Sequence, residues 1–241
     1  MNTVTINKNV LVLDNDPYKE NDGRIRIADE QGIYTVTAKG VQKLTSKNRL
    51  ICQPFSRVTM TLHDQNGYYS LLYGNTQKYY YHIPQDLIMQ TTCSLIHEIL
   101  RSHMMDSFLI MAVENMWKSF DQQDGNGYTW ACICLRDILM KEGIAPYIDG
   151  CVQCGTTRNL ETLSLPHGGF LCRNCNHGQF MKQTKEELIR IYSLFHVRED
   201  RISDFCNTYT WTIDDILEWA EWYQYYMHTQ IHSLQFLKTI R

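Results

Sequence analysis

Short bursts of alternating hydrophobic and polar residues fill the first third of the chain and predict β-strands. Turn residues such as Asp, Asn, Gly and Pro bound these bursts, which cover residues 10–13, 24–28, 33–38, 58–62 and 68–73. Five short strands in about seventy residues suit a small closed barrel, because closure removes exposed strand edges. The five-stranded OB-fold is the natural candidate for such a barrel.

Beyond Pro84 the hydrophobic residues recur at three- and four-residue steps, which predicts helices. Thr184 and Glu187 form the pattern of a capping box at the start of one helix. A last helix is expected from Ile213 to Leu237, with its apolar residues on a single stripe. Crowded aromatic residues on that helix either pack internally, which we favour, or form an exposed patch for a partner. We therefore predict an α+β protein, with an OB-fold barrel at residues 1–83 and a helical domain at residues 84–241.

The most specific chemical pattern is a pair of Cys-x-x-Cys motifs seventeen residues apart, formed by Cys151, Cys154, Cys172 and Cys175. This spacing is typical of a tetrahedral site with four thiolate ligands. Gly155, directly after the first motif, and Asn176, directly after the second, are expected to take the left-handed conformations that such turns need. We predict one structural Zn²⁺ in a module at about residues 149–178, inserted into the helical domain. A rubredoxin-like iron site is the alternative, since four cysteines also hold iron.

A zinc hydrolase or deaminase is the enzyme alternative, and the sequence argues against it. A catalytic zinc keeps one position open for water, whereas four thiolates close the coordination sphere. The His-x-Glu element of nucleobase deaminases is absent. His97-Glu98 begins like a His-Glu-x-x-His protease helix, but Arg101 occupies the position of the second histidine. His167 and His177 lie near the cysteines and are interpreted as surface residues rather than ligands.

The charge is unevenly distributed along the chain, and this changes the functional reading. A formal net charge of −3 alone argues against a nucleic-acid binder, yet residues 1–84 carry a net +3 and the remainder carries −6. Acidic residues are absent from Lys39 to Arg57, a run that forms either a solvated loop or a phosphate-binding face. Tyr34, Tyr68 and Tyr69 either stack on bases or simply pack on the barrel. The candidate DNA contacts are Arg24, Arg26, Lys39, Lys43, Lys47, Arg49 and Arg57.

The sequence contains no apolar run of the length that a signal peptide or a membrane span requires. Its nine cysteines, an odd number, suit a reducing compartment. We therefore expect a soluble cytoplasmic protein with no membrane partner.

The order of barrel, helices and inserted cysteine module resembles the RecO family of bacterial recombination mediators across nearly the whole chain. Short local patterns carry the resemblance. They are Val10-Leu11-Val12-Leu13, Tyr18-Lys19-Glu20-Asn21-Asp22, Ala38-Lys39-Gly40, Gln53-Pro54-Phe55 and Gly168-Gly169-Phe170-Leu171-Cys172. The chain departs from the family in having Lys19 where Gly is usual, and in a sparser basic stretch after Ala-Lys-Gly.

The resemblance implies a non-enzymatic protein of DNA repair and homologous recombination in the RecF pathway, associated with the nucleoid. Such a protein would bind single- and double-stranded DNA through the barrel and anneal complementary strands. With RecR it would help RecA displace single-strand-binding protein, whose acidic and hydrophobic C-terminal tail relatives bind through the helical domain. A small-molecule substrate is not expected. A zinc-containing transcription regulator, which would bind duplex DNA sequence-specifically, is the remaining alternative.

Overall fold

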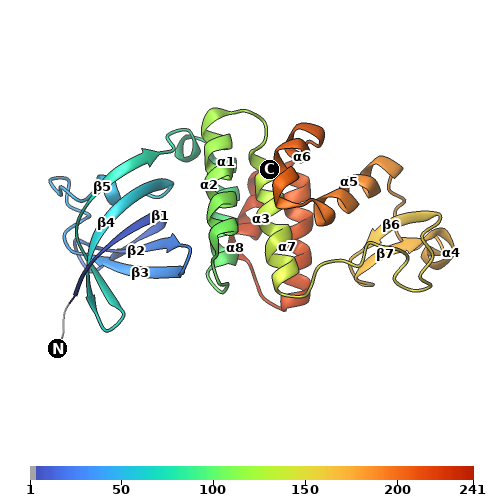
Figure 1. The fold of residues 1–241 in the computed structure, drawn as a ribbon, viewed down its shortest axis with the longest axis horizontal. Coiled ribbons are helices and arrows are strands. Elements are labelled where there is room, and N and C mark those ends of the chain that lie inside the picture. Colours follow the sequence, from blue (N-terminus) through green and yellow to red (C-terminus); the bar gives the residue numbers. More distant parts are fainter. Residues whose placement is uncertain (1–3) are drawn as a thin grey trace. The chain divides into compact units, whose positions relative to one another are not determined.

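The computed structural model describes residues 4–241, which divide into two compact units (Figure 1). The first unit runs to Gly127 and also includes Ile231–Arg241, while the second comprises Tyr128–Gln230. The chain therefore leaves the first unit and returns to it for its final helix. The expected division between residues 83 and 84 falls inside the first unit, at the change from strands to helices.

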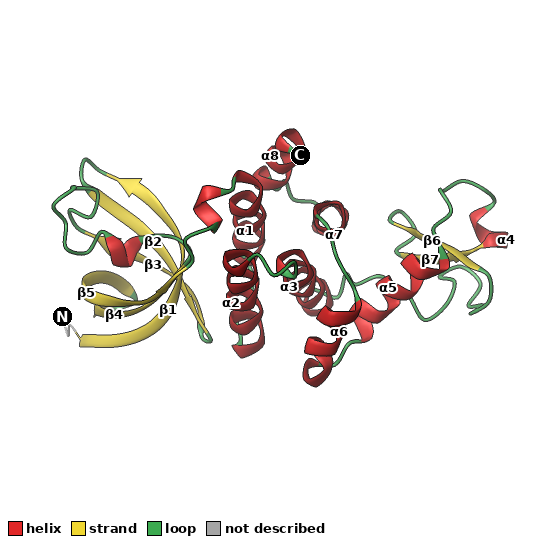
Figure 2. Ribbon diagram, turned by 90° about the horizontal axis from the view of Figure 1, so that it is seen from above, coloured by secondary structure: helices red, strands yellow, loops and turns green. Residues whose placement is uncertain are grey.

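Five strands form the N-terminal barrel, which confirms the predicted OB-fold. They are β1 (Val4–Tyr18), β2 (Asp22–Asp29), β3 (Gly32–Ala38), β4 (Ser56–Gln65) and β5 (Tyr68–Tyr79). The barrel is closed in the order β1-β2-β3-β5-β4, and β1 pairs with β4 to complete it. Strands β3 and β5 pair in parallel, whereas the other neighbours are antiparallel. Figure 2 shows the strands curling around a common interior.

Residues at alternate positions of the strands fill the interior of the barrel. Ile25 and Ile27 on β2 are fully buried, while Arg24 is exposed and Arg26 is half-buried. This alternation confirms that the two arginines face outward. Strand β1 differs, because Val10–Leu13 is buried without interruption and its register shifts between Val12 and Asp14. Both faces of β1 are therefore covered at this point.

The strands are longer than the hydrophobic bursts that predicted them, most clearly β1, which extends from residue 4 to residue 18. Polar side chains continue the pairing beyond the apolar positions. The hydroxyl of Thr61 on β4, for example, donates to Asn7 Oδ1 on β1 across 2.7 Å. Backbone ladders do not require apolar side chains, so hydrophobic alternation marks only the buried part of a strand.

Three helices complete the first unit: α1 (Leu87–Leu100), α2 (Ser107–Gln122) and α8 (His232–Ile240). The carboxylates of Asp86 and Asp106 accept hydrogen bonds from the first turns of α1 and α2. Glu98 on α1 accepts from the backbone N–H groups of His232 and Ser233, at 2.9 and 2.8 Å. A side chain from α1 therefore caps the start of α8 and ties the end of the chain to this unit.

The second unit is helical apart from a two-stranded hairpin. Its elements are α3 (Gly127–Lys141), β6 (Leu160–Ser164), β7 (Gly169–Cys172), α4 (Arg173–Asn176), α5 (Lys185–His196), α6 (Ile202–Thr208) and α7 (Ile213–Met227). The predicted capping box at the start of α5 is confirmed, since Thr184 and Glu187 bond each other's backbone N–H groups. None of the helices in the described part of the chain combines the length and the hydropathy that a membrane span requires.

The prediction of one continuous last helix is wrong. Helix α7 ends at Met227, the next residue His228 has a left-handed φ of +49°, and α8 begins only at His232. Both helices bury apolar residues at helical spacing, and periodicity cannot detect a change of direction that neither Gly nor Pro marks. The prediction that the aromatic residues pack internally is largely confirmed. Trp211, Trp219, Trp222 and Tyr223 are buried, whereas Tyr225 is 48% exposed.

Candidate metal centre and nucleic-acid interface

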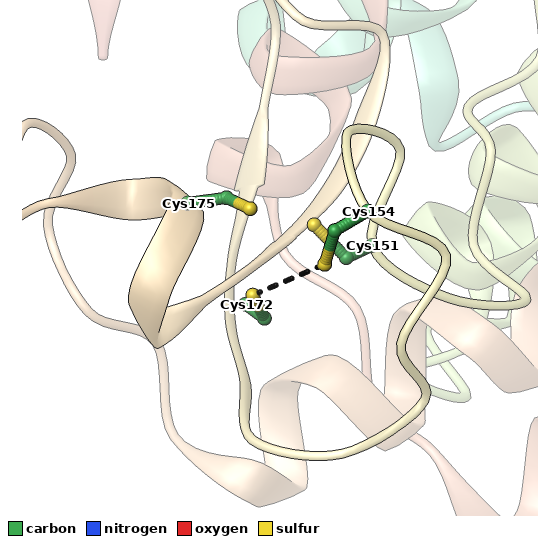
Figure 3. A group of neighbouring side chains, drawn as sticks. All are labelled: Cys151, Cys154, Cys172 and Cys175. Atoms are coloured by element: carbon green, nitrogen blue, oxygen red, sulfur yellow. Dashed lines mark hydrogen bonds between the residues drawn. The ribbon is translucent and has the colours of Figure 1, made fainter.

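The four cysteines of the two motifs come together at one point, with their side chains turned toward one another (Figure 3). Their four sulfur atoms all lie within 4.8 Å of each other, and Cys154 Sγ lies 3.7 Å from Cys172 Sγ. Zinc-sulfur bonds of about 2.3 Å in a tetrahedron place the sulfurs about 3.8 Å apart. The cluster therefore has the dimensions of a four-thiolate zinc site.

The backbone around the first motif forms the tight turn that brings its two sulfurs together. The N–H of Gly155 donates to the carbonyl of Cys151 across 2.8 Å, and the N–H of Cys151 donates to the carbonyl of Thr156, also across 2.8 Å. Gly155 has a φ of +73°, which confirms the predicted left-handed conformation. The N–H of Val152 bonds the carbonyl of Phe170 on β7, so the turn is fixed to the hairpin that carries Cys172.

The second motif closes differently from the expectation. Asn176 is the last residue of α4, and the left-handed residue is His177, with a φ of +46°. The Asn176 side chain is buried, where it donates to Glu161 and to the carbonyl of Phe180 and accepts from the Phe180 N–H. The Asn176 amide thus fixes the loop that follows Cys175. Asn176 therefore contributes through its side-chain hydrogen bonds rather than through a left-handed backbone conformation.

The surroundings of the sulfur atoms favour a bound cation. Burial opposes ionisation of Cys151, but nearby backbone N–H groups outweigh it and lower the pKa of this thiol to about 6. Burial and then the neighbouring sulfurs raise the pKa of Cys175 to about 12. Four thiolates this close repel one another unless a metal ion neutralises them. Four protein ligands leave no position for water, so the donor set suits a structural ion rather than a catalytic one.

The two nearby histidines are not part of the cluster. His177 is exposed, and His167 pairs with Ser164 through Nδ1 at 2.8 Å while its ring packs edge-on against Phe180. These contacts agree with the interpretation of both histidines as residues outside the metal site.

The seven cationic candidates for DNA binding fall into two groups. Arg26 forms ion pairs with Asp14, at 3.1 Å, and with Asp16, while Arg57 pairs with Glu114 on α2. Both arginines are half-buried, and their charges are already compensated within the first unit. A phosphate would have to compete with these carboxylates for either side chain.

The other five cations have no carboxylate within ion-pair distance among residues 4–241. Arg24 is exposed and its guanidinium lies 3.9 Å from the centre of the Tyr18 ring. The remaining four belong to the segment between β3 and a short 3₁₀ helix at Leu50–Cys52, here named the basic loop (residues 39–49). Lys39, Lys43 and Lys47 are exposed and Arg49 is partly exposed.

Hydrogen bonds attach the basic loop to the barrel at both ends. The Gly40 N–H donates to Asp22 Oδ1 across 2.8 Å, and the Gln42 N–H donates to the carbonyl of Asn21 across 2.9 Å. Near the other end, Asn48 Nδ2 donates to the carbonyl of Leu72 on β5 across 3.0 Å. The loop therefore presents its cations from a defined path along the barrel.

The three tyrosines suggested for base stacking differ in availability. The ammonium of Lys8 lies 4.3 Å from the centre of the Tyr34 ring, and the Tyr69 ring meets Tyr34 edge-on at 5.4 Å. Both rings are thus engaged in packing. Tyr68 is 81% exposed at the start of β5.

One feature beside the basic loop was not predicted from the sequence. A pocket of about 370 Å³ lies between Arg49 in the loop and the aromatic pair Tyr79, the last residue of β5, and Tyr81. The available signal was the run Tyr79-Tyr80-Tyr81, in which only the middle ring is buried. Alternation in that run indicates two outward tyrosines but not what lies next to them.

Comparisons with known proteins agree with this architecture. Residues 1–80 match the family model described as "Recombination protein O N terminal". The DNA repair protein RecO of Syntrophomonas wolfei is 26% identical over 174 residues, which cover 69% of this chain and 68% of that protein. The DNA repair protein RecO of Listeria innocua is 24% identical over 224 residues, which cover 89% and 83% respectively. The family model covers the barrel, the two relatives match most of the chain, and together these similarities support the RecO family.

Proposed function

We propose that this protein acts in DNA repair and homologous recombination by binding single- and double-stranded DNA and annealing complementary strands. The observation that carries the proposal is the OB-fold barrel with its attached loop of cations, which have no carboxylate partner in the described part of the chain. In this proposal residues 1–83 are the DNA-binding domain, and residues 84–241 are a helical domain containing the metal module at about residues 149–178. Relatives named as DNA repair proteins support the same role.

Annealing requires a surface that neutralises two phosphate backbones without reading their sequence. The basic loop and Arg24 offer positive charge without a fixed arrangement of hydrogen-bonding groups for particular bases. We propose that these five residues make most of the phosphate contacts. Arg26 and Arg57 remain candidates, with a smaller share because each already neutralises a carboxylate.

We propose that Cys151, Cys154, Cys172 and Cys175 hold one Zn²⁺ and that the protein is not an enzyme. When bound, the ion would cross-link the turn before β6 to the end of β7 and to α4. A backbone hydrogen bond from Val152 to Phe170 already holds that turn against β7. Metal analysis of the native protein separates zinc from the rubredoxin-like alternative, because iron would give a visible charge-transfer band.

Similarity to the RecO family supports the partners proposed for the helical part of the chain. We propose that the protein works in the cytoplasm at the nucleoid with RecR, binds the C-terminal tail of single-strand-binding protein, and thereby helps RecA to load. A pull-down with the tail peptide, and with a peptide lacking the terminal acidic and hydrophobic residues, tests this directly.

The central experiment replaces Lys39, Lys43, Lys47 and Arg49 together by Ala. Each phosphate contact contributes about 0.7 to the slope of log K against log salt for single strands. Removing four contacts should therefore lower the slope by up to about 2.8 and weaken binding and annealing accordingly. A gel-shift titration across a salt series measures the slope of log K, and annealing of complementary oligonucleotides at the same salt concentrations, without nucleotide added, measures the loss of annealing.

A matched variant controls for the loss of four positive charges. Lys118, Arg158, Lys182 and Lys185 are exposed cations outside the barrel, and their replacement by Ala changes the net charge by the same amount. This variant should retain the slope and most of the annealing. Normal annealing by the basic-loop variant, or equal losses in both variants, would show that the barrel face is not the DNA-binding surface. Metal content and circular dichroism confirm that both variants are folded.

A further inference from the structure

The pocket beside the basic loop has a lining suited to a nucleotide. It is lined by Arg49, Leu50, Gln53, Thr76, Tyr79 and Tyr81. This set combines an apolar and aromatic surface with two neutral polar side chains, one cation and no acidic residue. Leu50 is 75% exposed and Tyr81 is 64% exposed, so two large apolar side chains face solvent at its edge.

The pocket is held in shape by contacts between the basic loop and β5. Asn48 bonds the carbonyl of Leu72, and Gln53 Nε2 donates to the carbonyl of Arg49 across 3.1 Å. Ile51 approaches β5 at Gly74, where an added Cβ would lie 3.0 Å from Ile51 Cδ1 and 2.5 Å from the Thr59 carbonyl oxygen. A side chain at Gly74 would therefore clash first with the backbone of β4 and then with Ile51 in the 3₁₀ helix, so this close packing requires glycine.

The two tyrosines are preorganised although Tyr81 is largely exposed. Their rings meet edge-on, with centroids 4.6 Å apart and an interplanar angle of 87°. Tyr79 is half-buried and anchors the pair, and burial raises its pKa. A ring held in place by a neighbour loses little conformational entropy when a ligand stacks on it.

We propose that this pocket receives one base of single-stranded DNA, stacked on Tyr81 and flanked by Leu50, with the adjoining phosphate on Arg49. This inference depends on the proposed function. It adds base stacking to the phosphate contacts of the basic loop. A volume of about 370 Å³ lies within the range of pockets that enclose small ligands. The single cation on the rim complements a nucleotide, and Gln53 and Thr76 can meet the polar edge of a base. A base in a duplex must unpair to enter, so the pocket favours single strands.

The test compares an oligothymidine with a strand of equal length and charge that carries abasic sites instead of bases. The wild-type chain should bind the thymidine strand more tightly, and Tyr81→Ala should remove that advantage. The expected loss is roughly 5- to 150-fold for one stacked base. Tyr81→Ala should leave both the affinity for the abasic strand and the salt dependence unchanged, because no phosphate contact is removed.

Tyr73→Ala is the matched control, since Tyr73 on β5 is 63% exposed, close to the value for Tyr81, and does not line the pocket. It should keep the preference for the thymidine strand. Equal binding of both strands by the wild-type chain would overturn the inference while leaving DNA binding intact. So would a loss on Tyr81→Ala that is the same for both strands. Failure of the wild-type chain to bind either strand would refute the proposed function and this inference with it.

Discussion

Acid should destabilise the first compact unit through one buried histidine, His97 on α1. Its ring is 1% exposed and packs against Phe55 and Trp117, at centroid distances of 5.8 and 5.4 Å. Among residues 4–241 neither ring nitrogen makes a well-aligned hydrogen bond, although the Leu13 carbonyl is close enough to interact with the ring. Burial lowers the pKa of His97 to about 4, with the positive charges of Arg101 and Arg26 acting in the same direction. The carboxylate of Asp14 and the carbonyl of Leu13 offset this only in part.

The sign of the effect follows from where the proton binds. The unfolded chain takes up a proton at His97 near the ordinary pKa of 6.5, whereas the folded chain resists it until about pH 4. The contribution of the neutral His97 ring to the free energy of unfolding is therefore fully present above about pH 6.5 and is lost as the pH falls toward 4. The difference between a pKa of 6.5 in the unfolded chain and about 4 in the folded chain corresponds to about 3 kcal/mol. This is a large share of the roughly 5–15 kcal/mol by which domains are stable.

His97→Phe retains an aromatic ring at this position and removes the titrating group. Urea unfolding at about pH 7 and at about pH 4.5 should show the wild-type chain losing about 2 kcal/mol more than the variant. Subtracting one chain from the other cancels the contributions of the metal-binding thiols and of the carboxylates other than Asp14, whose pKa itself depends on His97. His63→Phe, on β4 of the same unit, controls for a histidine replaced elsewhere. Equal losses in the wild-type and His97→Phe chains would show that His97 does not sense acid.

Two further changes test the metal module and the last helix. Cys154→Ser should reduce the zinc content from about one ion per chain to almost none and lower the melting temperature of the second unit. Affinity for single strands should persist, and its disappearance would contradict a purely structural ion. Glu98→Ala removes the cap of α8 and should cost about 1 kcal/mol in urea unfolding. Glu98→Gln retains an acceptor oxygen and should cost less; an equal cost would argue against the capping role.

Local patterns in the sequence were sufficient for the barrel and for the cysteine cluster. Outward Arg24 and Arg26 follow from their alternation with buried Ile25 and Ile27, because successive side chains of a strand point to opposite faces whatever its neighbours are. The Cys-x-x-Cys spacing likewise predicts the cluster, since each motif needs only a local turn to aim two sulfurs together. Both features are encoded within a few residues.

Only the tertiary structure shows which of the seven cations already pair with a carboxylate and which are available to contact DNA. Arg57 finds its partner Glu114 fifty-seven positions along the chain, and no local pattern links them. The same holds for the break after α7 and for the pocket between Arg49 and Tyr81, which joins the basic loop to the far end of β5. Periodicity records which side of an element is buried, because burial repeats with the geometry of the backbone. It does not record what covers that side, because the covering segment is chosen by long-range packing.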